Sequence, residues 1–163
     1  RRVLCRSAVE SVDIAAAPRP VGENALLRSG LALAGANVRA SAENEDGILT
    51  AAEAARLDLQ GTQLVVLSAC ETGQGDVAHG EGVYGLRRAL VLAGAQSQLV
   101  SLWKVGDAAT EALMGEYYRR LAQGEGRAQA LRSAQQVMQS NPATAHPYYW
   151  AAFVPIGDWR AVE

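Results

Sequence analysis

The residue best suited to covalent chemistry in this sequence is Cys70, which follows a short apolar run at residues 64–67. A cysteine thiolate is a strong nucleophile, and small residues beside it let backbone N–H groups converge on a reacting oxygen. Gly73 and Gly75 follow the cysteine in this way. The pattern indicates a nucleophile beside a backbone oxyanion hole. The alternative is that Cys70 is a small buried apolar residue, as most free cysteines are.

A nucleophilic cysteine needs a base, and the chain has two histidines, His79 and His146. His79 lies nine positions after Cys70 in a glycine-rich stretch, within reach of the thiol. It is our candidate base, and an exposed loop histidine is the alternative. His146 precedes Pro147. We expect it to pack or to form hydrogen bonds at the start of the last strand.

Three further side chains are candidates for contact with a substrate. Glu71 directly follows Cys70, and we expect it either to contact a basic substrate side chain or to cap the following turn. Asp107 follows a second apolar run, where a carboxylate can pair with a basic substrate side chain through charge-assisted hydrogen bonds. For Asp107 we favour the alternative, the N-cap of the next helix. We expect Trp103 either to line the same substrate-binding cleft as Asp107 or to fill the core beside that cleft.

These residues need a sheet to bring them together. Residues 64–67 and 98–103 read as buried strands, and a helix from about residue 83 to 93 lies between them. Such a unit predicts two parallel strands. Because functional groups gather at the carboxyl ends of parallel strands, Cys70, Trp103 and Asp107 are expected at one edge of the sheet.

The remaining elements complete an α/β domain. Thr50 and Glu53 predict a capping box for a short helix over residues 51–57. We also predict an extended segment near residues 26–35, helices from residue 107 or 108 to about 123 and over 127–139, and a last strand over 148–156. Residues 1–24 form an irregular N-terminal segment, in which Arg6 interrupts a strand that begins at Val3. Residues 25–163 form the domain.

Composition limits the function classes. The 163 residues carry a net charge of −2, which argues against a general nucleic-acid binder. The chain has two cysteines and no histidine pair at metal-ligand spacing, so we expect no metal and no other cofactor. No apolar run reaches about 18 residues, so we expect no membrane partner and a cytoplasmic location. A nucleotide-binding domain is a weaker alternative, since no Lys-Ser/Thr follows the glycines.

Residues 64–73 (Leu-Val-Val-Leu-Ser-Ala-Cys-Glu-Thr-Gly) resemble the signature of CHAT domains, a caspase-like cysteine peptidase family found beside tetratricopeptide repeats. Other blocks fit the same family in order: residues 46–53, 80–86, 93–95, 101–107 with Thr110, and 146–153. The resemblance covers roughly residues 25–159. Several ordered blocks make it specific.

The resemblance implies a caspase-like three-layer sandwich with a mostly parallel sheet and a Cys–His dyad, with Cys70 as the nucleophile. It implies no cofactor, a protein or peptide substrate, and a parent chain of bacterial type with tetratricopeptide repeats. The family histidine belongs in a His-Gly pair upstream, but residues 2–11 contain no histidine. Two alternatives therefore stand: a cysteine peptidase acting through Cys70, or a catalytically inactive interaction or regulatory module of the same fold.

Overall fold

The computed structural model describes residues 2–6, 30–33, 47–68 and 82–162. Its strands and helices follow one another in this order along the chain: β1 (Arg2–Arg6), β2 (Gly30–Ala32), β3 (Ile48–Thr50), α1 (Ala51–Ala54), β4 (Thr62–Leu67), α2 (Gly82–Leu92), β5 (Ser97–Ser101), α3 (Asp107–Ala122), α4 (Arg127–Ser140), the 3₁₀ helix η3 (Pro147–Tyr149) and β6 (Phe153–Gly157).

The main sheet is mixed and has the strand order β1-β4-β5-β6. Strand β4 pairs in parallel with β1 on one side and with β5 on the other, whereas β6 pairs antiparallel with β5. The predicted parallel pair around a helix is confirmed, because α2 lies between β4 and β5 in the chain. A separate antiparallel pair joins β2 to β3.

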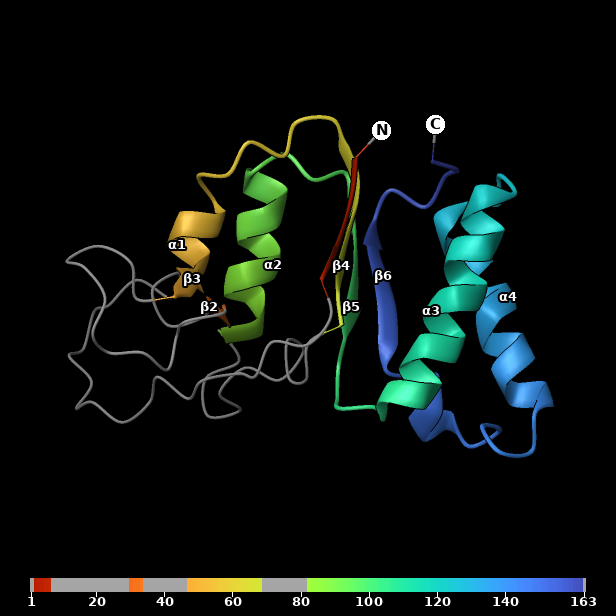
Figure 1. Ribbon diagram of the computed structural model, residues 1–163. Helices are drawn as coiled ribbons and strands as arrows, with labels where there is room; N and C mark the ends of the chain where they lie inside the picture. The colour runs from red at the N-terminus through yellow and green to blue at the C-terminus, as the bar shows by residue number, and fades with distance from the viewer. Residues whose placement is uncertain (1, 7–29, 34–46, 69–81, 163) are drawn as a thin grey trace, which may run out of the picture.

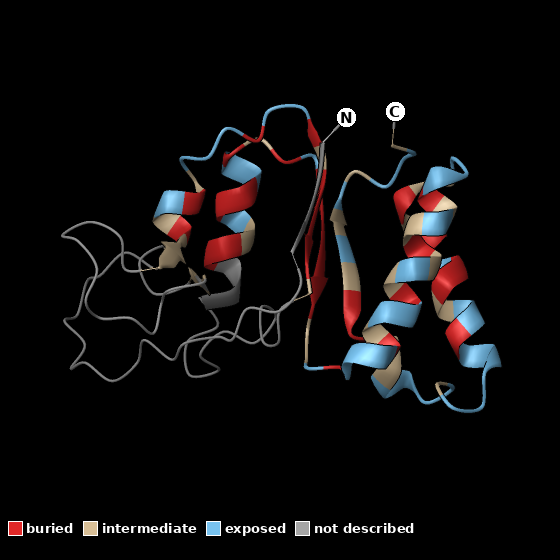
Figure 2. Ribbon diagram, viewed as in Figure 1, coloured by how far each residue is buried: buried red, intermediate tan, exposed pale blue. Residues whose placement is uncertain are grey.

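Helices cover both faces of the main sheet. Figure 1 shows α1 and α2 on one side of it and α3 and α4 on the other. Two cores result, and β4 contributes to both, with Leu64 and Val66 in the core under α3 and α4 and Val65 and Leu67 in the core under α1 and α2. Figure 2 shows buried residues along β4 and β5 and on the helix sides that face the sheet. Apolar side chains on both faces explain why these strands read as continuous apolar runs.

The predicted capping box at α1 is confirmed. The Thr50 side chain accepts from the Glu53 N–H at 3.2 Å, and the Thr50 N–H donates to a Glu53 carboxylate oxygen at 2.8 Å. Each side chain satisfies an N–H group that the helix itself leaves unpaired. Because β3 ends at Thr50, this cap also joins the small sheet directly to α1.

Two sequence predictions about strands are wrong in their limits. The last strand was expected over residues 148–156, but residues 147–149 form η3 and β6 starts only at Phe153. Pro147 explains the difference, since proline at the first position favours a helical turn. The first strand continues through Arg6 rather than stopping before it, because β1 pairs with β4 up to Arg6–Leu67. Residues 7–24 lie outside the described part of the chain.

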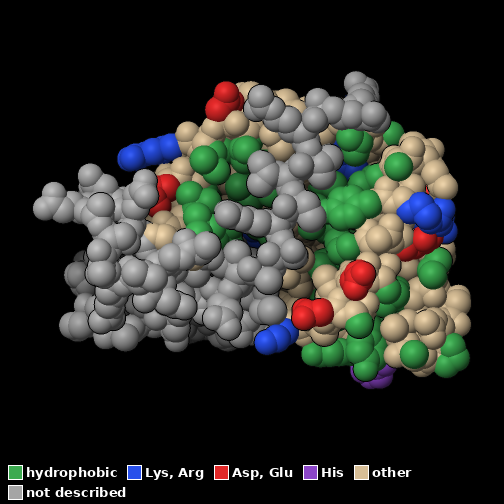
Figure 3. All heavy atoms as spheres, in the orientation of Figure 1, with side chains coloured by type: hydrophobic (Ala, Val, Ile, Leu, Met, Phe, Trp, Pro, Cys, Tyr) green, Lys and Arg blue, Asp and Glu red, His purple; other side chains and the backbone are tan. Residues whose placement is uncertain are grey.

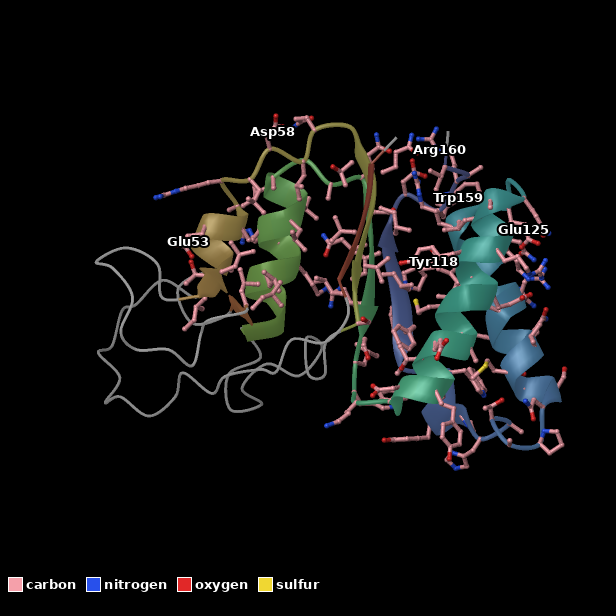
Figure 4. The ribbon with its side chains drawn as sticks, viewed as in Figure 1. Glu53, Asp58, Tyr118, Glu125, Trp159 and Arg160 are labelled. Atoms are coloured by element: carbon pink, nitrogen blue, oxygen red, sulfur yellow. The ribbon has the colours of Figure 1, made fainter. Side chains whose placement is uncertain are left out.

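The C-terminal residues cap α4. Gly126 precedes the helix and offers no side-chain cap; instead the Arg127 N–H donates to Arg160 O at 3.1 Å and the Ala128 N–H to Trp159 O at 3.4 Å. Figure 4 shows Trp159 and Arg160 beside the upper ends of α3 and α4. A Cβ at Gly126 would lie 3.0 Å from Trp159 O, so glycine permits the close approach.

An ion-pair group lies on the outer side of α3. Glu116 accepts from Arg119 Nε at 2.8 Å and from Arg120 Nε at 2.7 Å. The hydrogen bond from Arg119, followed by that from Arg120, lowers the pKa of Glu116 from 4.5 to about 2. On the inner side of the same helix, burial raises the pKa of Tyr117 to about 12. This tyrosine, 1% exposed, packs α3 onto the sheet.

We predict that Leu113→Ala in α3 lowers the free energy of unfolding by about 2–5 kcal/mol, because it removes a side chain that is 0% exposed and leaves a cavity. Leu92→Ala in α2 is the matched control, since Leu92 is 59% exposed. The control should change stability by less than about 0.5 kcal/mol. Urea unfolding measures both, and equal losses would contradict the packing of α3 on the sheet.

We predict that Glu116→Gln lowers stability at neutral pH by less than about 1 kcal/mol, since its arginine partners lie near the surface. The folded pKa of about 2 is below the ordinary value of 4.5, so the ionised Glu116 stabilises the fold above about pH 4.5 and loses this effect as the pH falls toward 2. Urea midpoints of the two proteins should therefore converge between pH 4.5 and 2. A constant difference between the two midpoints over this pH range would contradict the ion-pair role of Glu116.

Candidate functional site

The carboxyl ends of β4 and β5 form the edge at which the candidate residues are expected. Leu67 ends β4 and pairs with Val100, the residue before the last one of β5. The chain then leaves β5 and enters α3 at Asp107, so this loop and the start of α3 lie at the same edge, the lower one in Figure 1. Ligands of open α/β sheets bind at this kind of edge.

The loop over residues 102–106 is fixed from two directions. Its Leu102 N–H donates to Ala152 O at 2.8 Å, which ties it to the segment before β6. The Ser101 hydroxyl, in a residue 2% exposed, donates to Trp103 O at 2.7 Å and turns the chain as it leaves the strand. Val105 is 7% exposed and belongs to the core under α3. The loop is therefore ordered, and we call it the wall on the β5 side of this edge of the sheet.

Trp103 and Tyr148 hold this loop against η3 through two reciprocal hydrogen bonds. The Trp103 Nε1–H donates to Tyr148 O at 3.0 Å, and the Tyr148 hydroxyl donates to Lys104 O at 2.7 Å. We call this pair the Trp103–Tyr148 clasp. The Trp103 ring is partly buried and packs against the core, whereas Tyr148 remains 47% exposed. The indole of Trp103 thus packs beside the core, as one of its two expected roles required, and it also holds the loop over residues 102–106 against η3.

His146 has a structural role, as its position before Pro147 predicted. Its Nδ1 accepts from the Tyr148 N–H at 3.2 Å and so caps η3. This contact uses the His146 ring to hold the backbone at the start of η3.

Asp107 is the first residue of α3, and the prediction that it is the N-cap is wrong. The N-cap is Gly106, which has extended backbone angles and no side-chain cap. The Asp107 carboxylate is exposed, and no residue in the described part of the chain pairs with it. A negative charge in the first turn is favourable because it complements the helix dipole. Asp107 therefore presents an exposed carboxylate at the edge, without an ion-pair partner among the described residues.

Four of the six predicted site residues, Cys70, Glu71, Gly73 and His79, lie outside the described residues. The structure brings the other two, Trp103 and Asp107, to the same edge of the sheet. Sequence reasoning missed Tyr148, which it assigned to a strand. The available signal was the Pro147 that starts a helical turn.

The described residues add two findings on ligands and charge. Among residues 2–6, 30–33, 47–68 and 82–162, no group of three or more His, Cys, Asp or Glu side chains can hold a metal ion. The helices in those ranges include none with the length and apolarity required to cross a bilayer. In Figure 3 the acidic and basic side chains of the described residues are scattered over the visible face without a broad area of one sign.

Comparison with known protein families identifies the family to which this chain is related. The family described as CHAT domain matches residues 10–158. This chain belongs to the CHAT domain family. The match spans β2 through β6, including the loop and the Trp103–Tyr148 clasp at the edge. The resemblance stated from the sequence motifs is therefore confirmed.

Curated relatives of this CHAT domain are large proteins. Tetratricopeptide repeat protein 28 of Homo sapiens is 41% identical over 110 residues, and its Mus musculus counterpart is 40% identical over the same length. Those 110 residues are 68% of this chain but 4% of each relative. The family link to tetratricopeptide-repeat proteins is thus shown. Both relatives are mammalian, and the expected bacterial type of the parent chain stays a prediction.

We predict that His146→Ala lowers the free energy of unfolding by about 0.5–1 kcal/mol through loss of the cap on η3, and that His146→Asn recovers most of it, because asparagine also caps. Both variants should keep the wild-type rate of Cys70 alkylation. A thermal melt and mass spectrometry of the Cys70 peptide measure the two quantities. Loss of thiol reactivity in a stable His146→Asn variant would contradict the structural role.

Proposed function

We propose that this CHAT domain is a cysteine endopeptidase of caspase-like, three-layer architecture in which Cys70 is the nucleophile. One observation carries the proposal: β4 lies between two parallel neighbours, β1 and β5, and the chain reaches Cys70 three positions after β4 ends. A residue that follows a central strand at its carboxyl end is where α/β folds bind ligands and start chemistry. The domain proper covers residues 25–163, with residues 1–24 as an irregular segment that lends β1 to the sheet.

The proposed reaction is acyl transfer followed by hydrolysis. The Cys70 thiol gives its proton to the base and its sulfur attacks the carbonyl carbon of the scissile peptide bond. The tetrahedral intermediate collapses, the C–N bond breaks, and the base returns the proton to the leaving amine. Water, deprotonated by the same base, then hydrolyses the thioester and restores the thiol. Backbone N–H groups around Gly73 would stabilise the oxyanion.

His79 is the proposed base. The chain has two histidines, and the Nδ1 of His146 is occupied by its hydrogen bond to the Tyr148 N–H. His79 is the remaining imidazole, and it is close to Cys70 in the sequence. In the proposed reaction its neutral ring takes up the thiol proton, as imidazole commonly does in general base catalysis.

The proposed substrate is a protein or peptide with a basic residue before the scissile bond (the P1 residue). Asp107 supports this class, because its carboxylate is exposed at the edge and pairs with no described residue. Glu71 adds a second negative charge next to the nucleophile, and Trp103 supplies an apolar wall for the aliphatic part of the side chain. An arginine would form paired charge-assisted hydrogen bonds with a carboxylate.

The proposed setting is the cytoplasm, within a larger chain that carries tetratricopeptide repeats. The curated relatives are named as tetratricopeptide repeat proteins, and this chain matches only 4% of each of them. In that setting the repeats would choose or restrain the substrate. A reducing compartment also suits a free catalytic thiol. The chemistry requires no metal or organic cofactor.

A second candidate, a catalytically inactive interaction module, is favoured by one observation on β1. Strand β1 ends at Arg6, which pairs with Leu67 at the end of β4, and residues 7–11 follow β1 in the sequence. The family resemblance expects the catalytic histidine there, and residues 7–11 (Ser-Ala-Val-Glu-Ser) contain none. Such a module would bind peptide at the same edge without cleaving it.

We predict that Cys70 alkylation by iodoacetamide titrates with an apparent pKa well below the ordinary value of about 8.5, because a neighbouring imidazolium stabilises the thiolate. His79→Asn should move this pKa back toward about 8.5 and lower peptide turnover at least about 100-fold. Mass spectrometry of each cysteine peptide across pH 5–9 measures it, with Cys5 as the internal control.

The Cys70→Ala variant separates the two candidates. Loss of turnover in this variant, together with a lowered thiol pKa in the wild type, supports the peptidase. Alkylation of Cys70 that rises only above about pH 8, with peptide binding unchanged in Cys70→Ala, would overturn the peptidase in favour of the inactive module.

A further inference from the structure

The structure assigns a positioning role to the Trp103–Tyr148 clasp: we propose that the Tyr148 hydroxyl and the Trp103 Nε1–H hold the wall beside Asp107 and thereby set the preference for a basic P1 residue. This inference rests on the proposed function, because it needs a peptide substrate at this edge. It assigns no contact with the reacting atoms to either residue.

The geometry of the clasp is the first argument. Its two hydrogen bonds run in opposite directions, from Trp103 to the backbone of Tyr148 and from Tyr148 to the backbone of Lys104. Each side chain therefore fixes the backbone of the other segment. The bond from Tyr148 ends on Lys104 O, in the loop over residues 102–106, which has no regular secondary structure, and the bond from Trp103 ends on the carbonyl of Tyr148 in η3. The two side chains therefore add to the hold that the Leu102–Ala152 backbone bond and buried Val105 have on this loop.

The second argument concerns what lies just after the fixed loop. Val105 is buried, Gly106 is exposed, and Asp107 begins α3. A Cβ at Gly106 would meet nothing within 4 Å, so packing does not hold this residue in place. The helix start also has no side-chain cap. Ala109 anchors the first turn from the core side, and the clasp fixes the chain on the other side of Gly106.

The third argument is that the clasp lies near the surface, where its hydrogen bonds contribute little to the stability of the fold but can hold a loop beside a bound peptide. Tyr148 is 47% exposed, and hydrogen bonds at such a surface position contribute little to folding because water replaces them. The Tyr148 ring keeps its edge-to-face contact with Tyr149, 5.5 Å between centroids, whether or not the hydroxyl is present. Removal of the hydroxyl should thus loosen the loop without unfolding the domain.

Recognition of an arginine side chain is sensitive to small changes in the position of the loop over residues 102–106. A paired guanidinium–carboxylate contact depends on orientation as well as distance. A loop that samples several positions beside Asp107 would leave the carboxylate in place but admit water and other side chains. The expected consequence is a loss of selectivity for basic over neutral P1 residues, with the intrinsic reactivity of Cys70 preserved.

The test uses the whole chain and two peptidyl acyloxymethyl ketones that differ only in P1, arginine or leucine. The measured quantity is the ratio of their second-order rate constants for modification of Cys70, read by mass spectrometry. Tyr148→Phe should lower the arginine-to-leucine ratio at least threefold through a slower reaction with the arginine probe. Its rate with iodoacetamide should stay at the wild-type value.

Tyr149→Phe is the matched control, since it removes a hydroxyl from the neighbouring ring without touching the clasp, and it should leave the ratio unchanged. Trp103→Phe removes the opposite hydrogen bond and should change the ratio in the same direction as Tyr148→Phe. It also keeps the test valid if one variant folds poorly. Asp107→Asn should bring the ratio close to one.

The outcomes separate this inference from the proposed function. A wild type that prefers arginine, with the ratio lost in Asp107→Asn but kept in both Tyr148→Phe and Trp103→Phe, overturns the positioning role and leaves the peptidase standing. A wild type in which neither probe modifies Cys70 faster than it modifies Cys5 overturns the proposed function and this inference together. A lower ratio in both clasp variants, with Tyr149→Phe at the wild-type value, supports it.

Discussion

Strand β4 buries side chains on both of its faces at once, and much of this fold follows from that requirement. Successive residues of a strand point to opposite faces, so Leu64 and Val66 enter one core while Val65 and Leu67 enter the other. Neither helix pair could bury its apolar side without this shared surface. The pairs α1–α2 and α3–α4 therefore depend on the same six-residue strand.

The same constraint locates the functional edge. A strand with a parallel neighbour on each side has its carboxyl end beside the carboxyl ends of both, here near Arg6 and Ser101. The chain continues from β4 to α2 and from β5 to α3, and these two helices lie on opposite faces of the sheet, which is the arrangement in which α/β folds bind ligands. The binding properties of this edge then depend on short polar contacts such as the Trp103–Tyr148 clasp. They also depend on the start of α3, which lies at the same edge and has no side-chain cap.

Much of the fold was predictable because the signals were local or strongly apolar. The run at residues 64–67 predicted β4, and Thr50 and Glu53 predicted the cap of α1. A helix that begins at residue 107 or 108 was also predicted, and α3 confirms it. The errors came where a contact distant in sequence decided the outcome. Asp107 resembles a cap, but the loop anchored by Tyr148 brings Gly106 to that position. Residues 148–152 resemble a strand, but Pro147 and the His146 cap select a 3₁₀ turn.

The candidate site was less predictable than the fold for a physical reason that the histidines illustrate. A base must be oriented as well as present, and the sequence does not reveal orientation. His146 was expected to pack or to form hydrogen bonds, but only the structure shows that its Nδ1 accepts from the Tyr148 N–H. The register of β1 against β4 pairs Arg6 with Leu67. In the sequence Val9 follows Arg6 by three positions, just as Cys70 follows Leu67 by three. A histidine that forms an efficient dyad with Cys70 is therefore expected near Val9.

A histidine at the end of β1 would be held by a strand, whereas His79 belongs to a glycine-rich stretch of the sequence. A base held less firmly loses part of the rate advantage that fixed geometry supplies. The proposed peptidase would therefore be slower than an enzyme whose dyad spans two adjacent strand ends. Val9→His should therefore raise turnover through Cys70 above the wild-type value, because Val9 follows Arg6 by the same three positions by which Cys70 follows Leu67, the partner of Arg6.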